Sequence, residues 1–463
     1  MSTENGRDME KRRGIDMRRL FGTDGIRGIA NEFLSGELAY YTGRATATVL
    51  REVGKKYILI GKDTRQSGDM LEAALTAGIT SVGVNVVRLG VIPTPGVAYL
   101  TKRYNAMAGI VISASHNPGE YNGIKIFSHT GYKLPDEVED QIENLILHHR
   151  DKVACPIGAN LGTSLPDEGK VDAYIEYLIS KADAPLKGYR IALDCAHGAT
   201  YRIAPKVFDA LGAEVVVINT EPDGMNINKK CGSTNIDIIQ KLVQKVNAHI
   251  GFAFDGDGDR VIAVDERGGV MDGDHIMAAC GLFLKEKGKL KNNTIVGTVM
   301  SNLGFVQFME EHQLNFIAAP VGDRYVLEEM QKGDYILGGE QSGHVLFLDH
   351  GTTGDGILTA LQLVNVMLHT ERPISEINAM VKVYPQVLVN AMVKEENKKN
   401  YMMDEEISKS IKEIEDYFQG KGRVLIRPSG TEPFIRVMIE GEKEEILEEK
   451  AKDLAAMIEK RLG

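Results

Sequence analysis

Ala108-Gly-Ile-Val-Ile112 is followed without a break by Ser113-Ala-Ser-His-Asn-Pro118. A short apolar run that passes directly into a polar turn is typical of a buried strand with a loop at its carboxyl end. Tyr57–Ile60 and Asn85–Val91 are similar β-branched runs, and amphipathic helical segments lie between the three. This alternation predicts βα units, and hence an α/β fold, for the first part of the chain.

The alternation of strand and helix signals occurs three times before Tyr384-Pro385, where the pattern changes. Beyond that point two strand signals, 423–426 and 434–439, precede a charged helical segment at 444–462. We therefore expect three consecutive α/β domains and a C-terminal α+β domain around a central cleft, with one loop of each domain in the cleft. The expected domains are residues 1–168, 169–268, 269–383 and 384–463, and the Gly- and Pro-bearing segment 156–167 is an expected linker.

The charge balance of the chain is acidic. Its 463 residues include 54 basic and 65 acidic side chains, which gives a net charge of −11. The basic residues form no stripe, which argues against nucleic acid as a partner. Apolar runs such as Ala108–Ile112 are far shorter than the ~20 residues of a membrane-spanning helix. We therefore expect a protein that acts on small molecules and has no nucleic-acid or membrane partner.

Two further features favour a cytoplasmic location. The four cysteines are widely spaced and form no CxxC pair, so we expect reduced thiols at Cys155, Cys195, Cys231 and Cys280. The segment Met1–Arg19 is polar and mixed in charge, without the apolar core of a secretory signal. It predicts a disordered leader, and Met17 is a candidate alternative start.

The loop Ser113–Pro118 carries a candidate nucleophile. A serine hydroxyl becomes a useful nucleophile only when its surroundings activate it or when it carries a transferable group. Ser115 stands beside His116, and Lys125 supplies a cation a short distance further along the chain. The spacing alone does not decide between Ser113 and Ser115.

Asp255-Gly-Asp-Gly-Asp259 is a candidate metal site. Its carboxylates alternate with glycines that let the backbone curl around an ion, and hard oxygen ligands favour Mg²⁺ or Ca²⁺. An EF-hand is the alternative, because Glu266 stands at its twelfth position. However, Arg260 occupies the position that requires glycine, and the flanking segments have strand rather than helix patterns. We therefore expect a site of another kind for a hard divalent ion, formed by Asp255, Asp257 and Asp259.

Gly338-Gly-Glu-Gln-Ser-Gly-His344 follows a predicted strand at 335–337. Glu340 and Ser342 alternate with small residues, so both side chains can point into the same cleft. A carboxylate and a hydroxyl suit vicinal sugar hydroxyls, which both donate and accept hydrogen bonds. His344 is a candidate acid or base.

Arg427-Pro-Ser-Gly-Thr-Glu-Pro433 joins the two C-terminal strand signals. It offers a guanidinium, two hydroxyls and a glycine-flexed backbone whose N–H groups can cradle an anion. Arg436 lies on the following strand and adds a second cation. The loop therefore predicts a phosphate site formed by Arg427, Ser429, Gly430, Thr431 and Arg436.

The four motifs, in this order, resemble those of the α-D-phosphohexomutase family over residues 20–463. The resemblance implies that Ser115 is phosphorylated in the resting enzyme and that Asp255, Asp257 and Asp259 bind Mg²⁺ together with an oxygen of phospho-Ser115. It also implies that Glu340 and Ser342 hold sugar hydroxyls and that the loop at Arg427 holds the phosphate that is not transferred. A second family marker, Phe21–Gly28, places Arg27 at the active centre.

The reaction that the resemblance implies is a transfer of phosphate between O1 and O6 of a sugar phosphate. Phospho-Ser115 gives its phosphoryl group to the free hydroxyl, and the sugar 1,6-bisphosphate turns around and returns the other one. The expected acid and base groups are Arg27, Lys125, Arg260 and His344, with His116 and Arg324 as further substrate-binding residues. Gly61-Lys-Asp-Thr-Arg65 is a loop at a strand end, for which a turn is sufficient explanation, and we assign it no catalytic role.

Three segments resemble the subgroup of the family that interconverts glucosamine 6-phosphate and glucosamine 1-phosphate, towards UDP-N-acetylglucosamine. They are Asn226–Thr234, Gly322-Asp-Arg-Tyr-Val326 and Gln341. Asn235 and His197 depart from the usual histidine and asparagine of that subgroup. A phosphomannomutase/phosphoglucomutase of broader specificity is the alternative.

Candidates from other classes are weaker. A catalytically dead sugar-phosphate sensor would lack the nucleophile or an aspartate, and neither is lost. A metal-dependent phosphatase would not need a second phosphate cradle. The sequence leaves the oligomeric state open, and a homodimer is compatible with it.

Overall fold

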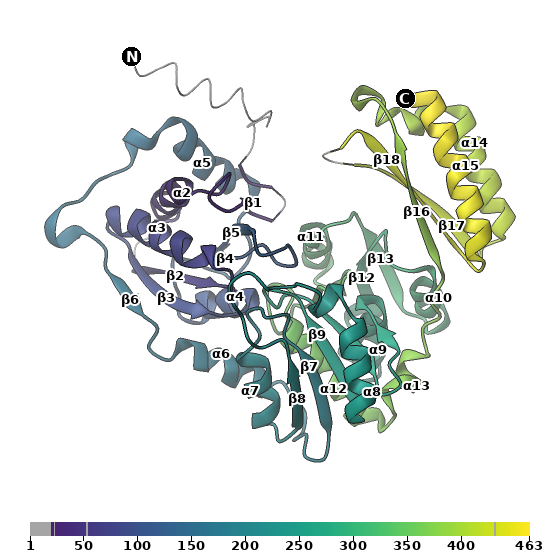
Figure 1. The fold of residues 1–463 in the computed structure, drawn as a ribbon, viewed down its shortest axis with the longest axis horizontal. Coiled ribbons are helices and arrows are strands. Elements are labelled where there is room, and N and C mark those ends of the chain that lie inside the picture. The colour runs from purple at the N-terminus through teal and green to yellow at the C-terminus, as the bar shows by residue number, and fades with distance from the viewer. Residues whose placement is uncertain (1–19, 23, 52–53, 430–431) are drawn as a thin grey trace. The chain divides into compact units, whose positions relative to one another are not determined.

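The computed structural model describes residues 20–463 except 23, 52–53 and 430–431. The expected leader at 1–19 lies outside the described residues. The chain divides into two compact units, residues 1–299 with 317–378 and residues 300–316 with 379–463. Each unit is built of sheets covered by helices (Figure 1).

The first sheet has six strands, four of which lie next to one another and are parallel. In spatial order they are β1 (Ile26–Ile29), β5 (Tyr121–Ser128), β4 (Ala108–Ile112), β2 (Tyr57–Lys62), β3 (Asn85–Val91) and β6 (Ser164–Pro166). The prediction of a linker at 156–167 is partly wrong. Strand β6 lies inside this segment and extends the sheet by pairing with β3. Strand β5 is antiparallel to β4, so that Lys125 stands opposite Val111.

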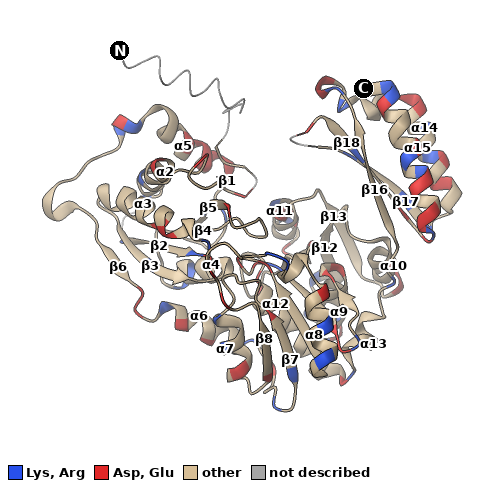
Figure 2. Cartoon of the chain, viewed as in Figure 1, with Lys and Arg blue, Asp and Glu red and all other residues tan. Residues whose placement is uncertain are grey.

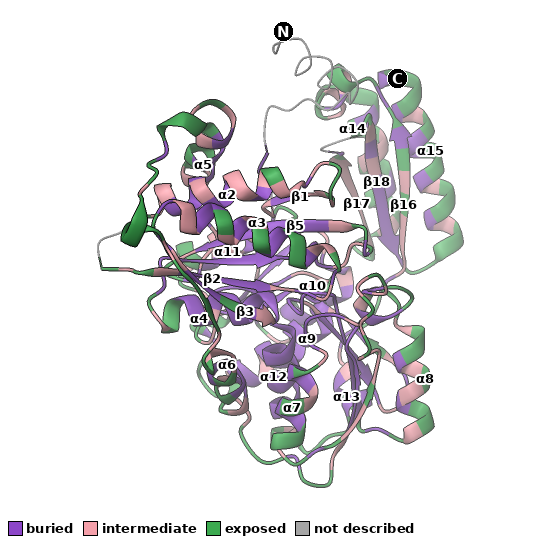
Figure 3. Cartoon of the chain, turned by 60° about the vertical axis from the view of Figure 1, so that its left-hand side comes forward, coloured by how far each residue is buried: buried purple, intermediate pink, exposed green. Residues whose placement is uncertain are grey.

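Helices cover both faces of this sheet. They are α2 (Gly36–Val49), α3 (Ser67–Ser81), α4 (Thr94–Arg103) and α5 (Asp136–His148). The side chains of Ile58 and Ile60 belong to the core formed with α2, α3 and α5. Helix α4 approaches the opposite face at Gly109, where a Cβ atom would lie 2.2 Å from Thr101 Oγ1. Figure 3 shows the strands buried between helices whose outer sides are exposed.

The second sheet has five strands. In spatial order they are β11 (Val270–Met271), β10 (Val261–Asp265), β9 (Ile250–Phe254), β7 (Arg190–Asp194) and β8 (Glu214–Ile218). Its helices are α6 (Lys170–Ile179), α7 (Ile203–Ala210) and α8 (Asp237–Val246). Strands β8, β7 and β9 are parallel, whereas β10 returns antiparallel to β9. The aspartate motif is the turn between β9 and β10, so it lies between strands and not between the helices of an EF-hand.

The third sheet has four strands. In spatial order they are β13 (Asn315–Ala319), β12 (Thr294–Thr298), β14 (Leu337–Gly339) and β15 (Val345–Phe347). Helices α9 (Gly273–Glu286), α11 (Asp323–Gly333), α12 (Gly356–Thr370) and α13 (Ile374–Asn378) accompany it. The strand predicted at 335–337 begins two residues later, and Gly338 and Gly339 belong to it because they pair with β15.

The second unit contains α10 (Leu303–Glu311) and a three-stranded antiparallel sheet. Its strands, in spatial order, are β16 (Gln386–Met392), β18 (Phe434–Gly441) and β17 (Gly422–Pro428). Helices α14 (Glu405–Phe418) and α15 (Glu444–Leu462) pack on the face that carries Val437 and Ile439. Lys, Arg, Asp and Glu are interspersed along both helices (Figure 2). The sheet and its two helices form the α+β arrangement predicted for this part of the chain.

Each of the four sequence motifs lies between two paired antiparallel strands or overlaps the end of the first of them. The pairs are β4 and β5, β9 and β10, β14 and β15, and β17 and β18. None of the described helices has the length and apolar character that crossing a membrane requires. The cysteines are unpaired, with Cys155 exposed and the other three buried.

A buried carboxylic acid begins helix α12. Asp355 is 4% exposed and caps the helix by accepting a hydrogen bond from the Leu358 backbone N–H at 3.0 Å. The Tyr174 hydroxyl donates to its other oxygen at 2.8 Å. Burial raises the pKa of Asp355 from 3.8 to about 6, although these hydrogen bonds oppose the rise.

Asp355→Asn tests this site through the pH dependence of stability. Because its folded-state pKa is raised, the stability that protonated Asp355 contributes is fully present below about pH 4 and is lost as the pH rises through about 6. The change corresponds to about 3 kcal/mol, and asparagine also caps helices. Relative to wild type, Asp355→Asn should therefore gain stability between pH 4 and 7.5 in urea denaturation.

Asp272→Asn is a matched control, since Asp272 caps α9 in the same way. Burial raises the pKa of Asp272, but its partner His275 lowers the pKa by more, so the pKa of Asp272 lies below its ordinary value of 3.8. The stability that ionised Asp272 contributes is lost as the pH falls. Relative to wild type, Asp272→Asn should therefore become less stable as the pH rises, which is the opposite of the trend expected for Asp355→Asn. A pH-independent difference between Asp355→Asn and wild type would contradict the assignment.

Candidate active site

The backbone at Ser115 is held in an unusual conformation. Its φ of +50° lies in the left-handed region, which residues other than glycine rarely adopt. Ser115 is 2% exposed, and its Oγ donates to Asp255 Oδ2 at 2.6 Å. His116 Nδ1 is 3.4 Å from the same Oγ. The loop therefore aims the Ser115 hydroxyl at the aspartate motif.

The three aspartates converge as a metal site would require. Oxygen atoms of Asp255, Asp257 and Asp259 all lie within 4.8 Å of one another, and all three residues are buried. Gly256 lets the two loops meet, because a Cβ atom there would lie 2.6 Å from the Ser115 carbonyl oxygen. The sequence motif thus becomes a compact cluster of carboxylates beside the serine.

The chemistry of this cluster fits a divalent cation. Burial raises the pKa of Asp255 well above 3.8, and the neighbouring carboxylates of Asp259 and Asp257 raise it further. One oxygen each of Asp257 and Asp259 is buried without a hydrogen-bond partner. Unpaired buried oxygens and mutual repulsion are both relieved by a hard metal ion. The cluster is therefore suited to a divalent metal.

Lys125 brings a buried ammonium group into the cluster. Its Nζ lies 2.9 Å from Asp257 Oδ2, 3.1 Å from Asp24 Oδ2 and 3.7 Å from Asp259 Oδ2. Burial alone would lower the pKa of Lys125, but these carboxylates raise it well above 10.5. The neighbouring carboxylates therefore favour the charged form of Lys125.

Two arginines border the same centre. Arg260 donates its backbone N–H to Asp255 Oδ1 at 3.1 Å, and its Nε is 3.8 Å from Asp259 Oδ1. Arg27 lies on β1 and forms an ion pair with Asp24. Burial lowers the pKa of His116, and Arg260 and Arg27 lower it further. The imidazole of His116 is accordingly neutral beside the serine.

His344 is buried between two carboxylates. Its Nδ1 is 3.6 Å from Asp259 Oδ2 and its Nε2 is 3.9 Å from Asp323 Oδ2. Burial opposes protonation, but Asp259 and Asp323 together raise the pKa of His344 above 6.5. Gly354 makes room for the ring, because a Cβ atom there would lie 2.6 Å from His344 Cε1.

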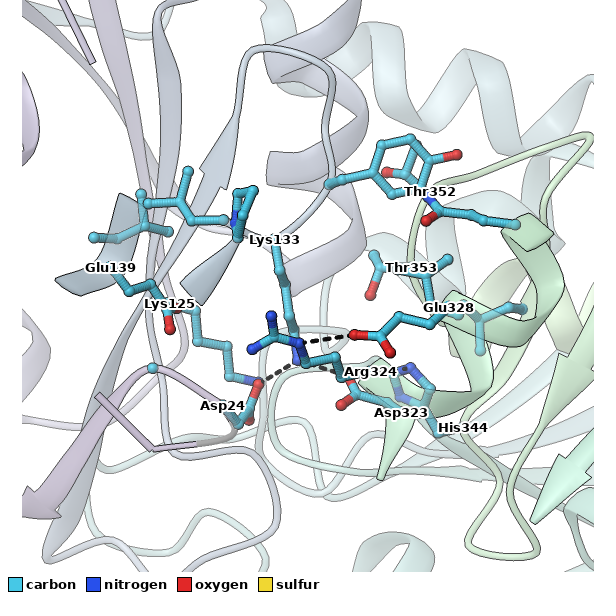
Figure 4. Close-up of a pocket in the computed structure, with 18 residues that line it drawn as sticks. Asp24, Lys125, Lys133, Glu139, Asp323, Arg324, Glu328, His344, Thr352 and Thr353 are labelled. Carbon is cyan, nitrogen blue, oxygen red and sulfur yellow. Dashed lines mark hydrogen bonds and ion pairs between the residues drawn. The ribbon is translucent and has the colours of Figure 1, made fainter. Parts of the chain in front are cut away.

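These contacts close into a ring in which carboxylates alternate with basic side chains. The ring runs through Asp24, Lys125, Asp259, His344, Asp323 and Lys133, and back to Asp24. Lys133 Nζ lies 2.6 Å from both Asp24 Oδ1 and Asp323 Oδ2 (Figure 4). Burial would raise the pKa of Asp24, but Lys125, Lys133 and Arg27 lower it. Lys133 was not singled out in the sequence, since no motif marks it.

Except for Asp259, the residues of this ring line a cavity of about 210 Å³, and Arg324 lines the same cavity (Figure 4). Arg324 forms ion pairs with Asp136 and, at 3.2 Å, with Glu328. The sequence interpretation grouped Arg324 with substrate-binding residues. In the structure its guanidinium is neutralised by two carboxylates.

Glu340 and Ser342 lie in the turn between β14 and β15. Glu340 Oε1 accepts a hydrogen bond from the Gly322 backbone N–H at 3.1 Å, and Ser342 Oγ lies 3.4 Å from Glu340 Oε2. Ser342 is exposed and Glu340 is half-buried. Burial lowers the pKa of Arg260, but the carboxylates of Asp259, Asp255 and then Glu340 raise it, and the net direction is upward. This places the third motif in the electrostatic field of the first two.

The fourth motif lies in the second unit. Arg427 and Arg436 are register partners on β17 and β18, so their side chains share one face of the sheet. Burial lowers the pKa of Arg427, and the charge of Arg436 lowers it further. Neither guanidinium has an ion-pair partner among the described residues. Two unneutralised cations side by side favour an anionic ligand.

Ser429 is buried beside these arginines and accepts a hydrogen bond from the Glu432 backbone N–H at 3.2 Å. Lys398, which the sequence reasoning missed, donates from Nζ to the Ser429 carbonyl at 3.0 Å. Gly430 and Thr431 lie outside the described residues.

Comparison with known proteins identifies the family of this chain. Four models of the phosphoglucomutase/phosphomannomutase family match the chain in sequence. They are alpha/beta/alpha domain I at residues 18–152, domain II at 172–269, domain III at 272–384 and the C-terminal domain at 388–457. The chain therefore belongs to the phosphoglucomutase/phosphomannomutase family of α-D-phosphohexomutases, and it is an enzyme of the isomerase class.

Within this family, the chain is similar over nearly its whole length to proteins named phosphoglucosamine mutase. The chain is 58% identical to the phosphoglucosamine mutase of Alkaliphilus oremlandii, over 96% of this chain and 100% of the relative. It is 56% identical to that of Finegoldia magna, over 96% of this chain and 99% of the relative.

Solved structures share the fold. A phosphoglucomutase/phosphomannomutase family protein from Burkholderia thailandensis matches with a TM-score of 0.77 at 23% identity, covering 95% of this chain and 97% of that one. The N-acetylphosphoglucosamine mutase of Aspergillus fumigatus, in complex with GlcNAc-6P and magnesium, matches with a TM-score of 0.68 at 16% identity and covers 96% of both chains.

Asp257→Asn should weaken metal binding without disturbing the fold. Saturating Mg²⁺ stabilises a protein that binds it only when folded, by about 2.7 kcal/mol at 100 times the Kd. We expect MgCl₂ to raise the melting temperature of the wild type by several degrees and to have little effect on Asp257→Asn. Asp172→Asn, which removes an exposed carboxylate paired with Lys206, is the control. Equal responses of wild type and Asp257→Asn would contradict the site.

Proposed function

We propose that this enzyme interconverts glucosamine 6-phosphate and glucosamine 1-phosphate, on the route to UDP-N-acetylglucosamine. The choice of sugar rests on relatives that are 54–58% identical and carry the name phosphoglucosamine mutase. The observation that carries the reaction type is the 2.6 Å contact between Ser115 Oγ and a carboxylate of the metal-type cluster. A phosphomannomutase/phosphoglucomutase of broader specificity is the alternative.

Phosphoryl transfer begins at Ser115 in this proposal. The bond from phosphorus to Ser115 Oγ breaks, and a bond from phosphorus to the free sugar hydroxyl forms, which gives the 1,6-bisphosphate. The bisphosphate then reverses its orientation, and its other phosphoryl group returns to Ser115. Asp255, Asp257 and Asp259 would hold Mg²⁺ with a phosphoserine oxygen, and the ion would neutralise charge on the phosphoryl group.

Protons must leave the attacking hydroxyl and return to the Ser115 oxygen or the sugar. Lys125 and Arg260 are cationic, which suits them to donate hydrogen bonds to phosphoryl oxygens. The proposed acid and base groups are Arg27, Lys125, Arg260 and His344. His116, with its lowered pKa, is available as a neutral acceptor beside Ser115.

Substrate binding is assigned to the two remaining motifs. Glu340 and Ser342 would hold ring hydroxyls in either orientation, with His116 and Arg324 as further contacts. Arg427, Ser429, Gly430, Thr431 and Arg436 would hold the phosphate that is not transferred. The paired and unneutralised guanidiniums of Arg427 and Arg436 support this assignment.

The wider proposal concerns organisation and setting. Residues 1–168, 169–268, 269–383 and 384–463 would act as four domains. The acidic net charge of −11 supports a small-molecule substrate rather than nucleic acid. We place the enzyme in the cytoplasm, with a sugar 1,6-bisphosphate as activator and a homodimer as a candidate assembly.

Steady-state kinetics test the proposed reaction. With Mg²⁺ and a trace of sugar bisphosphate, kcat/KM should be highest for glucosamine 6-phosphate when compared with glucose 1-phosphate and mannose 1-phosphate. Ser115→Ala should be folded and inactive, because it has no oxygen to carry the phosphoryl group. Equal or higher values on the neutral sugars would favour the alternative, and activity of Ser115→Ala would exclude this nucleophile.

Arg427→Ala should weaken substrate binding more than it slows turnover. A hydrogen bond to a charged group is worth about 1.5–3 kcal/mol, so KM should rise by about 10- to 100-fold. Arg461→Ala is the control, because it removes a partly exposed arginine of the same unit that is paired with Asp404. An unchanged KM in Arg427→Ala would move the phosphate site elsewhere.

A further inference from the structure

Two sequence motifs without an assigned role meet at the loop that carries Ser115. They are Gly61-Lys-Asp-Thr-Arg65, after β2, and Asn226–Thr234, between β8 and α8. We propose that Arg65 and Asn228 are positioning residues that fix the backbone of Ser115 for phosphoryl transfer. This inference rests on the proposed function of Ser115 as the phosphate carrier.

Arg65 reaches the loop from within the first sheet's domain. Its side chain is fully buried and forms an ion pair with Asp63. Its Nη2 donates to the Ser115 carbonyl at 3.1 Å and to the Asn117 carbonyl at 2.6 Å. A planar guanidinium can bridge two carbonyl groups in a fixed geometry, which a lysine ammonium does not reproduce.

Asn228 approaches the same two carbonyl groups from a different sheet. Its Nδ2 donates to the Ser115 carbonyl at 2.9 Å and to the Asn117 carbonyl at 3.1 Å. Asn228 is 9% exposed and itself has a φ of +59°, which asparagine tolerates better than most residues. Both carbonyl oxygens therefore receive two side-chain donors, one from each motif.

A third contact fixes the other side of Ser115. Its backbone N–H donates to Ser113 Oγ at 3.0 Å, and that hydroxyl in turn donates to Asp63. The peptide groups before and after Ser115 are thus both held, which maintains the left-handed φ and the direction of the Ser115 side chain. The Arg65 side chain hydrogen-bonds to the backbone carbonyl groups of this loop and not to Ser115 Oγ, so Arg65 acts through the backbone.

The reaction makes this rigidity useful. The Ser115 oxygen gives up a phosphoryl group and later receives one, and both steps need the same oxygen position relative to the aspartates. Misplacing a reacting group by about 1 Å can cost about 100-fold in rate. Loss of the hydrogen bonds from Arg65 or Asn228 should therefore lower kcat. KM depends on the sugar and phosphate loops and should change little.

Asn228→Asp is the sharper test, because it keeps the shape of the side chain and replaces the donor with a carboxylate that faces two carbonyl oxygens. We expect kcat to fall by about 100-fold with KM within about 3-fold of wild type. Rapid-quench mass spectrometry should show equally slowed loss of phosphate from Ser115 on mixing with glucosamine 6-phosphate. Asn235→Asp, which changes an exposed asparagine directly after this segment, should leave both constants unchanged.

Arg65→Lys provides a second variant, since it keeps a positive charge beside Asp63 and removes the bridging geometry. A similar fall in kcat, with Mg²⁺-induced stabilisation retained, would support positioning. Wild-type kcat in either folded variant, or a rise in KM alone, would overturn the inference. If the wild type itself fails to interconvert the glucosamine phosphates, the proposed function fails, and this outcome is separate from the effect of the variants.

Discussion

Mutual repulsion among three buried carboxylates is the constraint on which the active centre depends. Asp255, Asp257 and Asp259 could not share so small a volume without compensating positive charge. Lys125 provides part of it from β5, and Lys133 and His344 extend the compensation through Asp24 and Asp323. The remaining unpaired oxygens suit a divalent ion. The same charges that allow the cluster to fold are therefore those that can stabilise a phosphoryl group in transfer.

Much of the fold could be predicted from the sequence, because parallel strands buried on both faces form continuous apolar runs. The errors lie where neighbouring chain segments decide the structure. Strand β6 forms in a Gly- and Pro-bearing segment because β3 offers a free edge. Strand β14 includes two glycines, which carry no strand signal of their own but pair with β15. Strand pairing of this kind depends on contacts that local patterns do not contain.

The site could be predicted only as far as its motifs extend. Ser115 and the aspartates stand in short, unusual stretches, and the structure brings these stretches together. Lys133 and Lys398 stand in ordinary stretches, and their importance follows from contacts with Asp323 and with the Ser429 carbonyl, far away in sequence. Arg65 and Asn228 were visible within motifs, but their shared target became apparent only from the positions of two carbonyl groups.

The four motif-bearing turns have a common construction, since each is held at both ends by adjacent antiparallel strands. Strand pairing fixes where such a turn starts and where it returns, whatever residues lie between. The chemistry of one turn can therefore change without displacing the other three. In the turn between β14 and β15, for example, a residue such as Gln341 could be exchanged while Ser115 and the aspartates keep their places. The scaffold thus allows the side chains of one loop to diversify while those of the other loops stay in position.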